Sequence, residues 1–209
     1  MGEGRKRDRG GSLTSIKMPE KLGSITFWIT PRCNLNCKYC FAYQIWGKKP
    51  EAVATGEVID ALIRFGEENM APDGVIWFFG GEPMVAFDKM REMYEKVRER
   101  GLRWRFGLTT NLTLVDEEKA KWLGKNGFSI LCSLDGIKEA HDRYRVYPDG
   151  RGSWEDAWEG LKNVRLYMDP NPTIRLTYAP KTAQYLYESV KFLMKHCLLY
   201  TSPSPRDRG

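Results

Sequence analysis

Residues 24–40 read SITFWITPRCNLNCKYC, in which a β-rich run leads directly into a loop that holds Cys33, Cys37 and Cys40. Thiolates are soft ligands, and several on one short loop can bind zinc or an iron–sulfur cluster. A structural zinc site or an ordinary electron-transfer cluster takes four protein ligands, whereas three thiolates leave one iron of a [4Fe–4S] cube open. The three cysteines therefore predict a metal site with an open position, which implies chemistry.

A zinc site is the alternative interpretation of the same loop. It needs a fourth ligand from elsewhere, and the remaining candidates are His141, His196 and Cys132. We interpret His141 as a helix-surface or capping histidine and Cys132 as a buried strand thiol, because such residues are more often structural than functional. Neither is expected to be a ligand.

The composition is that of a globular chain with one substantial core. Of the 209 residues, 42% are apolar and 29% are charged, and no long apolar run or secretory signal pattern occurs. Five cysteines without paired spacings do not indicate a disulfide framework. We expect a cytoplasmic protein without a membrane segment.

The two ends of the chain differ from its body. Residues 1–22 are rich in Gly, Ser and basic residues and predict a flexible basic arm with no assigned function, so a nucleic-acid partner is not favoured. Residues 197–207 read CLLYTSPSPRD, which equals the translation of a transposase-type sequencing adapter. We therefore expect residues 197–209 not to be native, the genuine sequence to stop near His196, and the core domain to cover 23–196.

Between these ends, β-rich runs alternate with amphipathic runs. Thr55 and Asp116 are predicted helix N-caps, and Ser153 with Asp156 fits a capping box. Strands separated by helices of this length require parallel crossovers, so the sequence predicts five βα units and a parallel sheet with helices on at least one face. The expected strands are 24–30, 75–79, 104–110, 128–134 and 173–179, and the expected helices are 55–69, 84–100, 116–125, 153–168 and 182–195.

Polar or glycine-rich clusters follow the first four predicted strands. They are the cysteine loop, GGEP (80–83), TTN (109–111) and SLDG (133–136). The carboxyl ends of parallel strands meet at one edge of a sheet, where α/β proteins place their functional sites. All four clusters are therefore expected at one edge, with the TTN run lining a cofactor or substrate pocket.

CNLNCKYC followed by FFGGEP, TTN, SLDG and HDRYR resembles the radical S-adenosylmethionine (SAM) enzymes, over about residues 24–195. Within them the chain looks most like anaerobic sulfatase-maturating enzymes and the SPASM-type peptide maturases. The resemblance implies a partial (β/α)6 barrel, here truncated after about the fifth βα unit. It also implies a [4Fe–4S] cluster, reductive cleavage of SAM to a 5′-deoxyadenosyl radical, a peptide or protein substrate, and a reductant such as ferredoxin or flavodoxin.

The resemblance also implies roles for individual residues. The three cysteines would hold the cluster, the backbone of Tyr39 would meet the adenine, and the GGEP run would receive the ammonium of SAM. An arginine fork suits a carboxylate, which is the role that the resemblance gives to Arg145. The residues implied in SAM binding are Tyr39, Gly80, Gly81, Glu82, Ser133 and Arg145.

Each of these roles has a structural alternative. Tyr39 could shield the cluster from solvent, and GGEP could be a turn with Glu82 near a helix start. Ser133 could be a strand-end hydroxyl, and Arg145 a solvated charge for which Arg143 competes. No catalytic acid or base can be assigned.

Two other functions stay open at this stage. One is a radical SAM enzyme that modifies RNA or a small molecule, and the other is a non-enzymatic zinc or iron–sulfur binding module. A sixth strand and an auxiliary-cluster domain, which the resemblance leads one to expect, are not in the sequence, so the chain as written could be inactive.

Overall fold

The computed structural model describes residues 20–42 and 51–196. The expected adapter-derived tail and residues 1–19 of the expected arm lie outside these ranges, so both stay predictions. Within the described ranges, no helix combines the length and the apolar character needed to cross a membrane.

The described residues form one parallel sheet in which sequence neighbours pair in the order β1-β2-β3-β4-β5. This arrangement confirms the predicted α/β class. The first strand begins two residues earlier than expected, because Leu22 already pairs with Met70. The strands are β1 (Leu22–Thr30), β2 (Met70–Gly80), β3 (Arg105–Thr110), β4 (Ser129–Ser133) and β5 (Thr173–Arg175).

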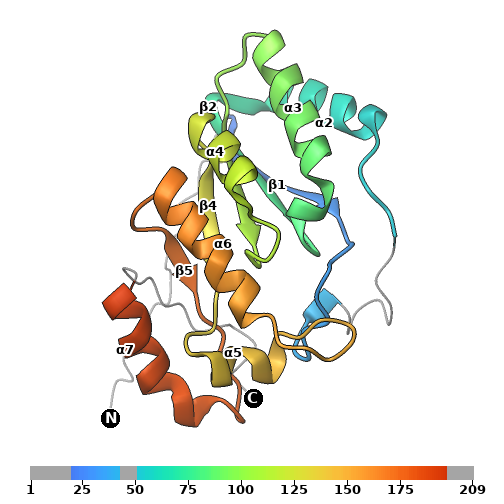
Figure 1. Cartoon of the computed structure of the whole chain (residues 1–209). Helices are drawn as coiled ribbons and strands as arrows, with labels where there is room; N and C mark the ends of the chain where they lie inside the picture. The colour runs from blue at the N-terminus through green and yellow to red at the C-terminus, as the bar shows by residue number, and fades with distance from the viewer. Residues whose placement is uncertain (1–19, 43–50, 197–209) are drawn as a thin grey trace, which may run out of the picture.

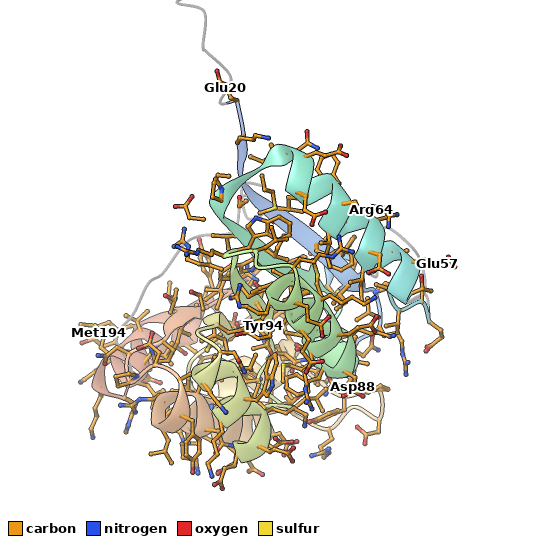
Figure 2. The ribbon with its side chains drawn as sticks, turned by 90° about the horizontal axis from the view of Figure 1, so that it is seen from above. Glu20, Glu57, Arg64, Asp88, Tyr94 and Met194 are labelled. Carbon is orange, nitrogen blue, oxygen red and sulfur yellow. The ribbon has the colours of Figure 1, made fainter. Side chains whose placement is uncertain are left out.

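Helices cover one face of the sheet (Figure 1). The α2 and α3 helices lie side by side in Figure 2, where they carry the labels Glu57 and Asp88, and the Lys96 Nζ–Asp60 Oδ1 ion pair of 2.9 Å joins them. The helices are α2 (Gly56–Asn69), α3 (Phe87–Glu99), α4 (Glu117–Lys125), α5 (Lys138–Tyr144), α6 (Trp154–Tyr167) and α7 (Leu186–His196), with short 3-10 turns at Pro83–Ala86 and Ala183–Tyr185.

Side chains alternate between the two faces of each strand. On β2 and β3, Phe78, Phe106 and Leu108 are buried beneath the helices in the apolar core. Their neighbours Trp77 and Thr109 point to the opposite face, where the Trp77 indole donates a 2.9 Å hydrogen bond to the Thr109 hydroxyl. We call this opposite side the helix-free face.

The predicted caps of two helices are confirmed. Thr55 Oγ1 accepts from Val58 N at the start of α2, and Asp116 Oδ1 accepts from Lys119 N at the start of α4. The prediction of a capping box at Ser153 is wrong. The Ser153 hydroxyl donates to Arg145 O, and Asp142 Oδ1 accepts from Trp154 N at the start of α6.

Two further expectations are corrected near the end of the sheet. The last strand spans Thr173–Arg175 rather than 173–179, because Thr177 N donates to the Asp135 carboxylate instead of continuing the ladder. The α5 helix was not expected, and its His141 is buried rather than on the surface. The two differences involve Asp135 and His141, which both lie at the carboxyl edge of the sheet.

Candidate functional site: a cysteine loop beside a buried Tyr–Asp–Arg cluster

The cysteine loop begins where β1 ends and is held by the glycine pair that ends β2. Gly81 N donates to Thr30 O at 2.9 Å, and Glu82 N donates to Arg32 O at 2.8 Å. A Cβ at Gly80 would lie 2.1 Å from Thr30 O, and one at Gly81 would lie 2.2 Å from Arg32 O. Only glycine permits this approach, so the two motifs fit each other.

The three cysteines are partly buried on this loop. Asn111 Nδ2 lies 3.9 Å from the Cys33 sulfur, and Leu35 N donates to the same sulfur at 3.4 Å. Cys40 N donates to Cys37 O, which closes the turn between the second and third cysteine. The loop therefore presents three thiols on a fixed backbone.

The loop is also fastened to the segment after α5. Asn36 N donates to Val146 O at 2.6 Å, and Lys38 N donates to Tyr144 O at 2.9 Å. The thiols thus lie between the glycine pair on one side and the Arg145 region on the other. The cysteine loop, the glycine pair, Asn111 of the TTN run and the segment after α5 therefore meet in one place.

Each of the three candidates for a fourth zinc ligand is engaged elsewhere in the fold. His141 engages both ring nitrogens inside the fold, Cys132 lies in the apolar core, and the His196 ring packs against Phe192. Across residues 20–42 and 51–196, no three His, Cys, Asp or Glu side chains are arranged to hold a single metal ion.

Glu82 is a buried anchor of the site. Its carboxylate accepts from Met84 N at 3.0 Å, from the Thr110 hydroxyl at 2.8 Å and from Asn111 N at 2.6 Å. Burial raises the pKa of Glu82 to about 7, against the lowering effect of these hydrogen bonds and of Arg145. Glu82 also caps the 3-10 turn at Pro83–Ala86, which confirms the interpretation of GGEP as a turn with Glu82 near a helix start. The role of GGEP in receiving the ammonium of SAM stays a prediction.

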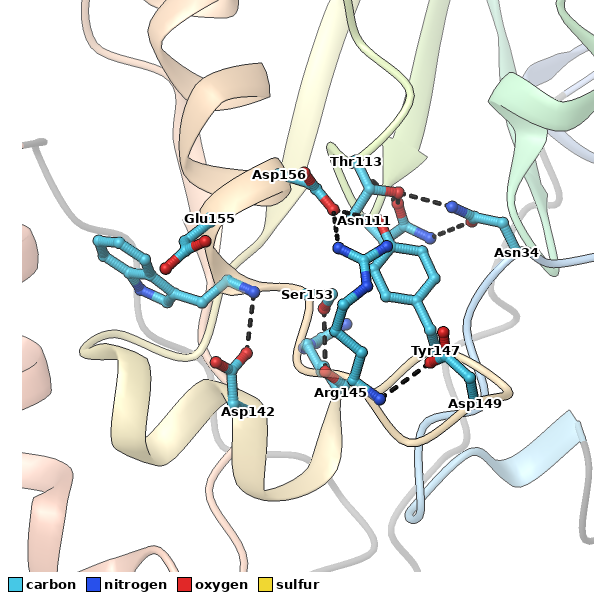
Figure 3. Close-up of polar contacts among 12 residues, drawn as sticks. Asn34, Asn111, Thr113, Asp142, Arg145, Tyr147, Asp149, Ser153, Glu155 and Asp156 are labelled. Carbon is cyan, nitrogen blue, oxygen red and sulfur yellow. Dashed lines mark hydrogen bonds and ion pairs between the residues drawn. The ribbon is translucent and has the colours of Figure 1, made fainter.

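Asn111 links β3 to the cysteine loop. Its Nδ2 donates to Asn34 Oδ1 at 3.0 Å, and Asn34 Nδ2 donates to the Thr113 hydroxyl at 2.7 Å. Figure 3 shows Asn34 facing both partners across the gap between the two loops. The TTN run therefore positions the thiol loop. The sequence predicted either a pocket-lining role or, for Asn111, hydrogen bonds to loop backbone groups, and Asn111 Oδ1 does accept from Thr113 N at 3.1 Å.

Tyr39, Asp135 and Arg145 form one cluster, in which Asp135 and Arg145 are buried and Tyr39 is partly buried. The Tyr39 hydroxyl donates to Asp135 Oδ2 at 2.5 Å, Arg145 Nε donates to the same oxygen at 2.9 Å, and the guanidinium lies over the Tyr39 ring. Arg145 is only 7% exposed, so its interpretation as a solvated charge is wrong. The structure thus brings together two residues that the resemblance implies in SAM binding.

Charge and burial shape the titration of this cluster. Burial raises the pKa of Tyr39 well above its ordinary value, with Arg145 opposing and Asp135 reinforcing the shift. Burial alone would lower the pKa of Arg145, but the neighbouring Asp135, Tyr39 and Cys37 keep it above its usual range. Tyr39 is therefore neutral and Arg145 cationic at any physiological pH.

His141 supports the cluster from α5. Its Nδ1 accepts from Asp135 N at 3.3 Å, and its Nε2 lies 3.0 Å from the Ser153 hydroxyl. That hydroxyl donates to Arg145 O at 2.9 Å (Figure 3). Since the serine hydroxyl donates to the carbonyl, His141 Nε2 must donate to the serine. Burial lowers the pKa of His141 to about 4, which agrees with this neutral tautomer.

Asp135 and His141 belong to the candidate site, although the sequence does not predict a role for either in it. Asp135 lies in SLDG and His141 in HDRYR, so both motifs carry the signal. What the sequence could not reveal is that α5 folds back, so that its histidine reaches the backbone of the aspartate.

Ser133 ends β4 beside this cluster on the helix-free face. Its Cα pairs with that of Arg175 on β5, and its hydroxyl has no hydrogen-bond partner among the described residues. The two terminal nitrogens of Arg145 are likewise without a partner in the part of the chain that the structure describes. These donors are available to a ligand.

The residues present fit the cofactors that the sequence predicts. The donor set is three thiols on one loop, which suits a cluster with one open iron. The glycine pair leaves no room for side chains, and Ser133 and Arg145 offer unused donors nearby. Such donors complement the carboxylate and hydroxyl groups of SAM.

A parallel α/β sheet that carries three cysteines after its first strand and a glycine pair after its second defines a class of cluster-binding barrel proteins. The chain belongs to the Radical SAM superfamily, whose sequence model matches residues 29–193. This membership confirms the predicted family and agrees with the predicted use of a [4Fe–4S] cluster and SAM.

Two curated relatives indicate how the family varies. A cysteine-type anaerobic sulfatase-maturating enzyme from Clostridium novyi is 30% identical over 155 residues, which cover 69% of this chain and 41% of that protein. An Fe-coproporphyrin III synthase from Methanosarcina barkeri is 37% identical over 146 residues, which cover 68% of this chain and 34% of that protein. The chain thus spans less than half the length of either relative.

A solved structure confirms the fold. The sulfatase-maturating enzyme anSMEcpe with bound AdoMet superposes with a TM-score of 0.75 at 25% identity, over 88% of this chain and 50% of that one. A second structure of that enzyme, with AdoMet and the Cp18Cys peptide, gives a TM-score of 0.74 at 25% identity and covers 88% of this chain and 51% of that one.

Proposed function

We propose that the chain is the barrel part of a radical SAM enzyme in which Cys33, Cys37 and Cys40 hold a [4Fe–4S] cluster. When bound, the cluster supplies the electron that cleaves SAM to methionine and a 5′-deoxyadenosyl radical. The observation that carries the proposal is the cysteine loop, fixed by the glycine pair on one side and adjoining the Tyr39–Asp135–Arg145 cluster on the other.

The chain's own residues bind and orient in this proposal. The Arg145 guanidinium pairs with the carboxylate of SAM, and the Ser133 hydroxyl donates to its carboxylate or ribose. Glu82 contributes through its backbone, because its carboxylate is already occupied by Met84 N, Thr110 and Asn111 N. Tyr39 contributes its backbone, because its side chain is committed to Asp135.

We propose a peptide or protein side chain as the substrate. Sulfatase-maturating relatives and the peptide-bound anSMEcpe structure support this choice. A small carboxylated molecule is the second candidate, which the 37% identity to the Fe-coproporphyrin III synthase favours. Ferredoxin or flavodoxin as the electron donor stays a prediction from the resemblance.

The test is anaerobic reconstitution of the chain with iron and sulfide, followed by reduction with dithionite. We expect a SAM-dependent change in the cluster's EPR signal and formation of 5′-deoxyadenosine. Cys37→Ala should lose both the bound iron and 5′-deoxyadenosine, because two thiolates seldom retain a cubane.

Cys132→Ala is the matched control, since this thiol lies in the apolar core rather than on the loop. It should retain the iron and the SAM-dependent EPR change. Stoichiometric zinc without iron in the parent chain, or 5′-deoxyadenosine production by Cys37→Ala, would contradict the proposal.

A further inference from the structure

Arg175 holds a positive charge on the helix-free face of the sheet, beside the candidate site. Its neighbour Ile174 is buried in the core beneath the helices, so Arg175 points to the opposite face. Its Cα pairs with that of Ser133 across β4 and β5. Directly paired residues of adjacent strands place their side chains on the same face, so Arg175 and Ser133 are neighbours.

No carboxylate neutralises Arg175 within the described residues. The nearby Asp135 is committed, because its carboxylate accepts from Tyr39, from Arg145 and from Thr177 N. Partial burial and the proximity of Arg145 lower the pKa of Arg175, while Tyr39 and Asp135 oppose this shift. Two cations close together, one of them without a counterion, are unfavourable for the fold alone.

The donors at this position match one ligand chemistry. A guanidinium offers a planar fork of N–H donors and no acceptor, and the adjacent Ser133 hydroxyl has no partner among the described residues. Such a set is complementary to a carboxylate, which can accept from both groups and neutralise the charge. A neutral amide or a cation would leave the charge unpaired.

We propose that Arg175 and Ser133 form a carboxylate-binding subsite on the helix-free face, distinct from the Asp135–Arg145 pair. The subsite rests on the proposed function only for the source of the carboxylate, which is either SAM or an acidic group of the substrate. SAM has a single carboxylate, for which Arg145 is the other candidate partner. If Arg145 binds that group, Arg175 is left for an acidic group of the substrate.

Binding measurements on the reconstituted full chain, without reductant, test the subsite. The probes are SAM and decarboxylated SAM, and N-acetyl-aspartate amide and its neutral isostere N-acetyl-asparagine amide. If SAM supplies the carboxylate, Arg175→Gln weakens SAM binding by about tenfold or more and decarboxylated SAM binding by less. If the substrate supplies it, the variant binds SAM as the parent does and loses the preference for the aspartate probe.

Two variants serve as comparisons. Arg175→Lys keeps the charge but not the fork, and should retain part of the lost affinity. Arg105→Gln removes a charge from the same face at the first residue of β3, where Arg105 Nε donates to Asp73 O. It should change neither the preference for SAM over decarboxylated SAM nor the preference for the aspartate over the asparagine probe.

Stability provides the second measurement. Because Arg175 is unpaired, Arg175→Gln should unfold at the same temperature as the parent or at a higher one. A substantially lower unfolding temperature would assign Arg175 a structural role and overturn the subsite, as would unchanged binding of all four probes. If the parent chain prefers the carboxylated probes but forms no 5′-deoxyadenosine, the proposed function is contradicted and the subsite is not.

Discussion

Asp135 joins three segments of the chain through one carboxylate. It accepts from Tyr39 on the cysteine loop, from Arg145 after α5 and from Thr177 N after β5. A buried charge pair of this kind depends on both partners, because removing one leaves the other charged and unpaired. The geometry of the candidate SAM site therefore depends on a residue that is not expected to touch the cluster.

Replacement of Asp135 tests this dependence. Asp135→Asn should lower the free energy of unfolding by about 3 kcal/mol or more, because Arg145 stays buried without its counterion. Tyr39→Phe removes one hydrogen bond to the same carboxylate and should cost only about 1 kcal/mol. Denaturant unfolding measures both, and equal losses in the two variants would contradict the role of the charge pair.

His141 gives the fold a pH dependence whose sign follows from its burial. The pKa of His141 is about 4 in the folded chain against an ordinary value of 6.5. Between these values the unfolded chain binds a proton that the folded chain does not, so stability is complete above pH 6.5 and falls as the pH drops to about 4. The loss from this residue amounts to about 3 kcal/mol at most.

His141→Gln isolates this effect, since glutamine keeps one acceptor and one donor but does not titrate. Glu82 acts in the opposite direction, because its raised pKa of about 7 against 4.5 makes stability fall as the pH rises between these values. The contribution of Glu82 is the same in the parent and in His141→Gln, so it cancels in the difference between their free energies of unfolding. The stability advantage of the parent over the variant should shrink from pH 6.5 to pH 4, and a constant difference would contradict the assignment.

At the scale of elements, α6 packs on the loop that follows β3. A Cβ at Gly160 would lie 2.1 Å from Leu112 O, and Leu112 itself has a positive φ of 73°. The close approach holds the turn that carries Asn111, and Asn111 in turn contacts the cysteine loop. The helix therefore supports the turn that carries Asn111.

Gly160→Ala should separate α6 from this loop and lower the free energy of unfolding by about 1–3 kcal/mol, the range observed for overpacked cores. It should also reduce the iron retained after reconstitution, because the Asn111–Asn34 contact is displaced. Gly56→Ala in α2 is the matched control, since its Cβ would meet only the movable ends of the Glu92 and Lys96 side chains. Iron retention equal to that of the parent would contradict the coupling.

At the scale of the whole molecule, cohesion decreases from the centre of the sheet towards β5. β3 pairs on both sides, with β2 and β4, whereas β5 contributes Thr173–Arg175 and pairs with β4 alone among the described strands. The aromatic core of Phe78, Phe106 and Phe128 also lies beneath the central strands. Site groups on β5 are therefore attached to the least supported strand.

Hydrogen exchange should reflect this gradient. Backbone amides of β3 should exchange slowest, and those of β5 and α7 should exchange faster, because local opening needs fewer contacts to break there. Mass spectrometry of peptides from both regions measures the difference. Protection of β5 equal to that of β3 would show that the strand is as firmly held as the centre.

The sequence by itself determined the succession of strands and helices along the chain, the parallel sheet and the motifs at its carboxyl edge. These features are local signals that can be recognised without knowledge of the fold. They are hydrophobic periodicity, N-caps such as Thr55, and the spacing of Cys33, Cys37 and Cys40. Only the tertiary structure decided that Ser153 supports Arg145 rather than capping α6, that Asp135 joins three segments, and that Arg175 lies unpaired beside Ser133. Buried polar groups choose their partners by proximity in space, and that proximity arises only when the strands and the loops after them have packed together.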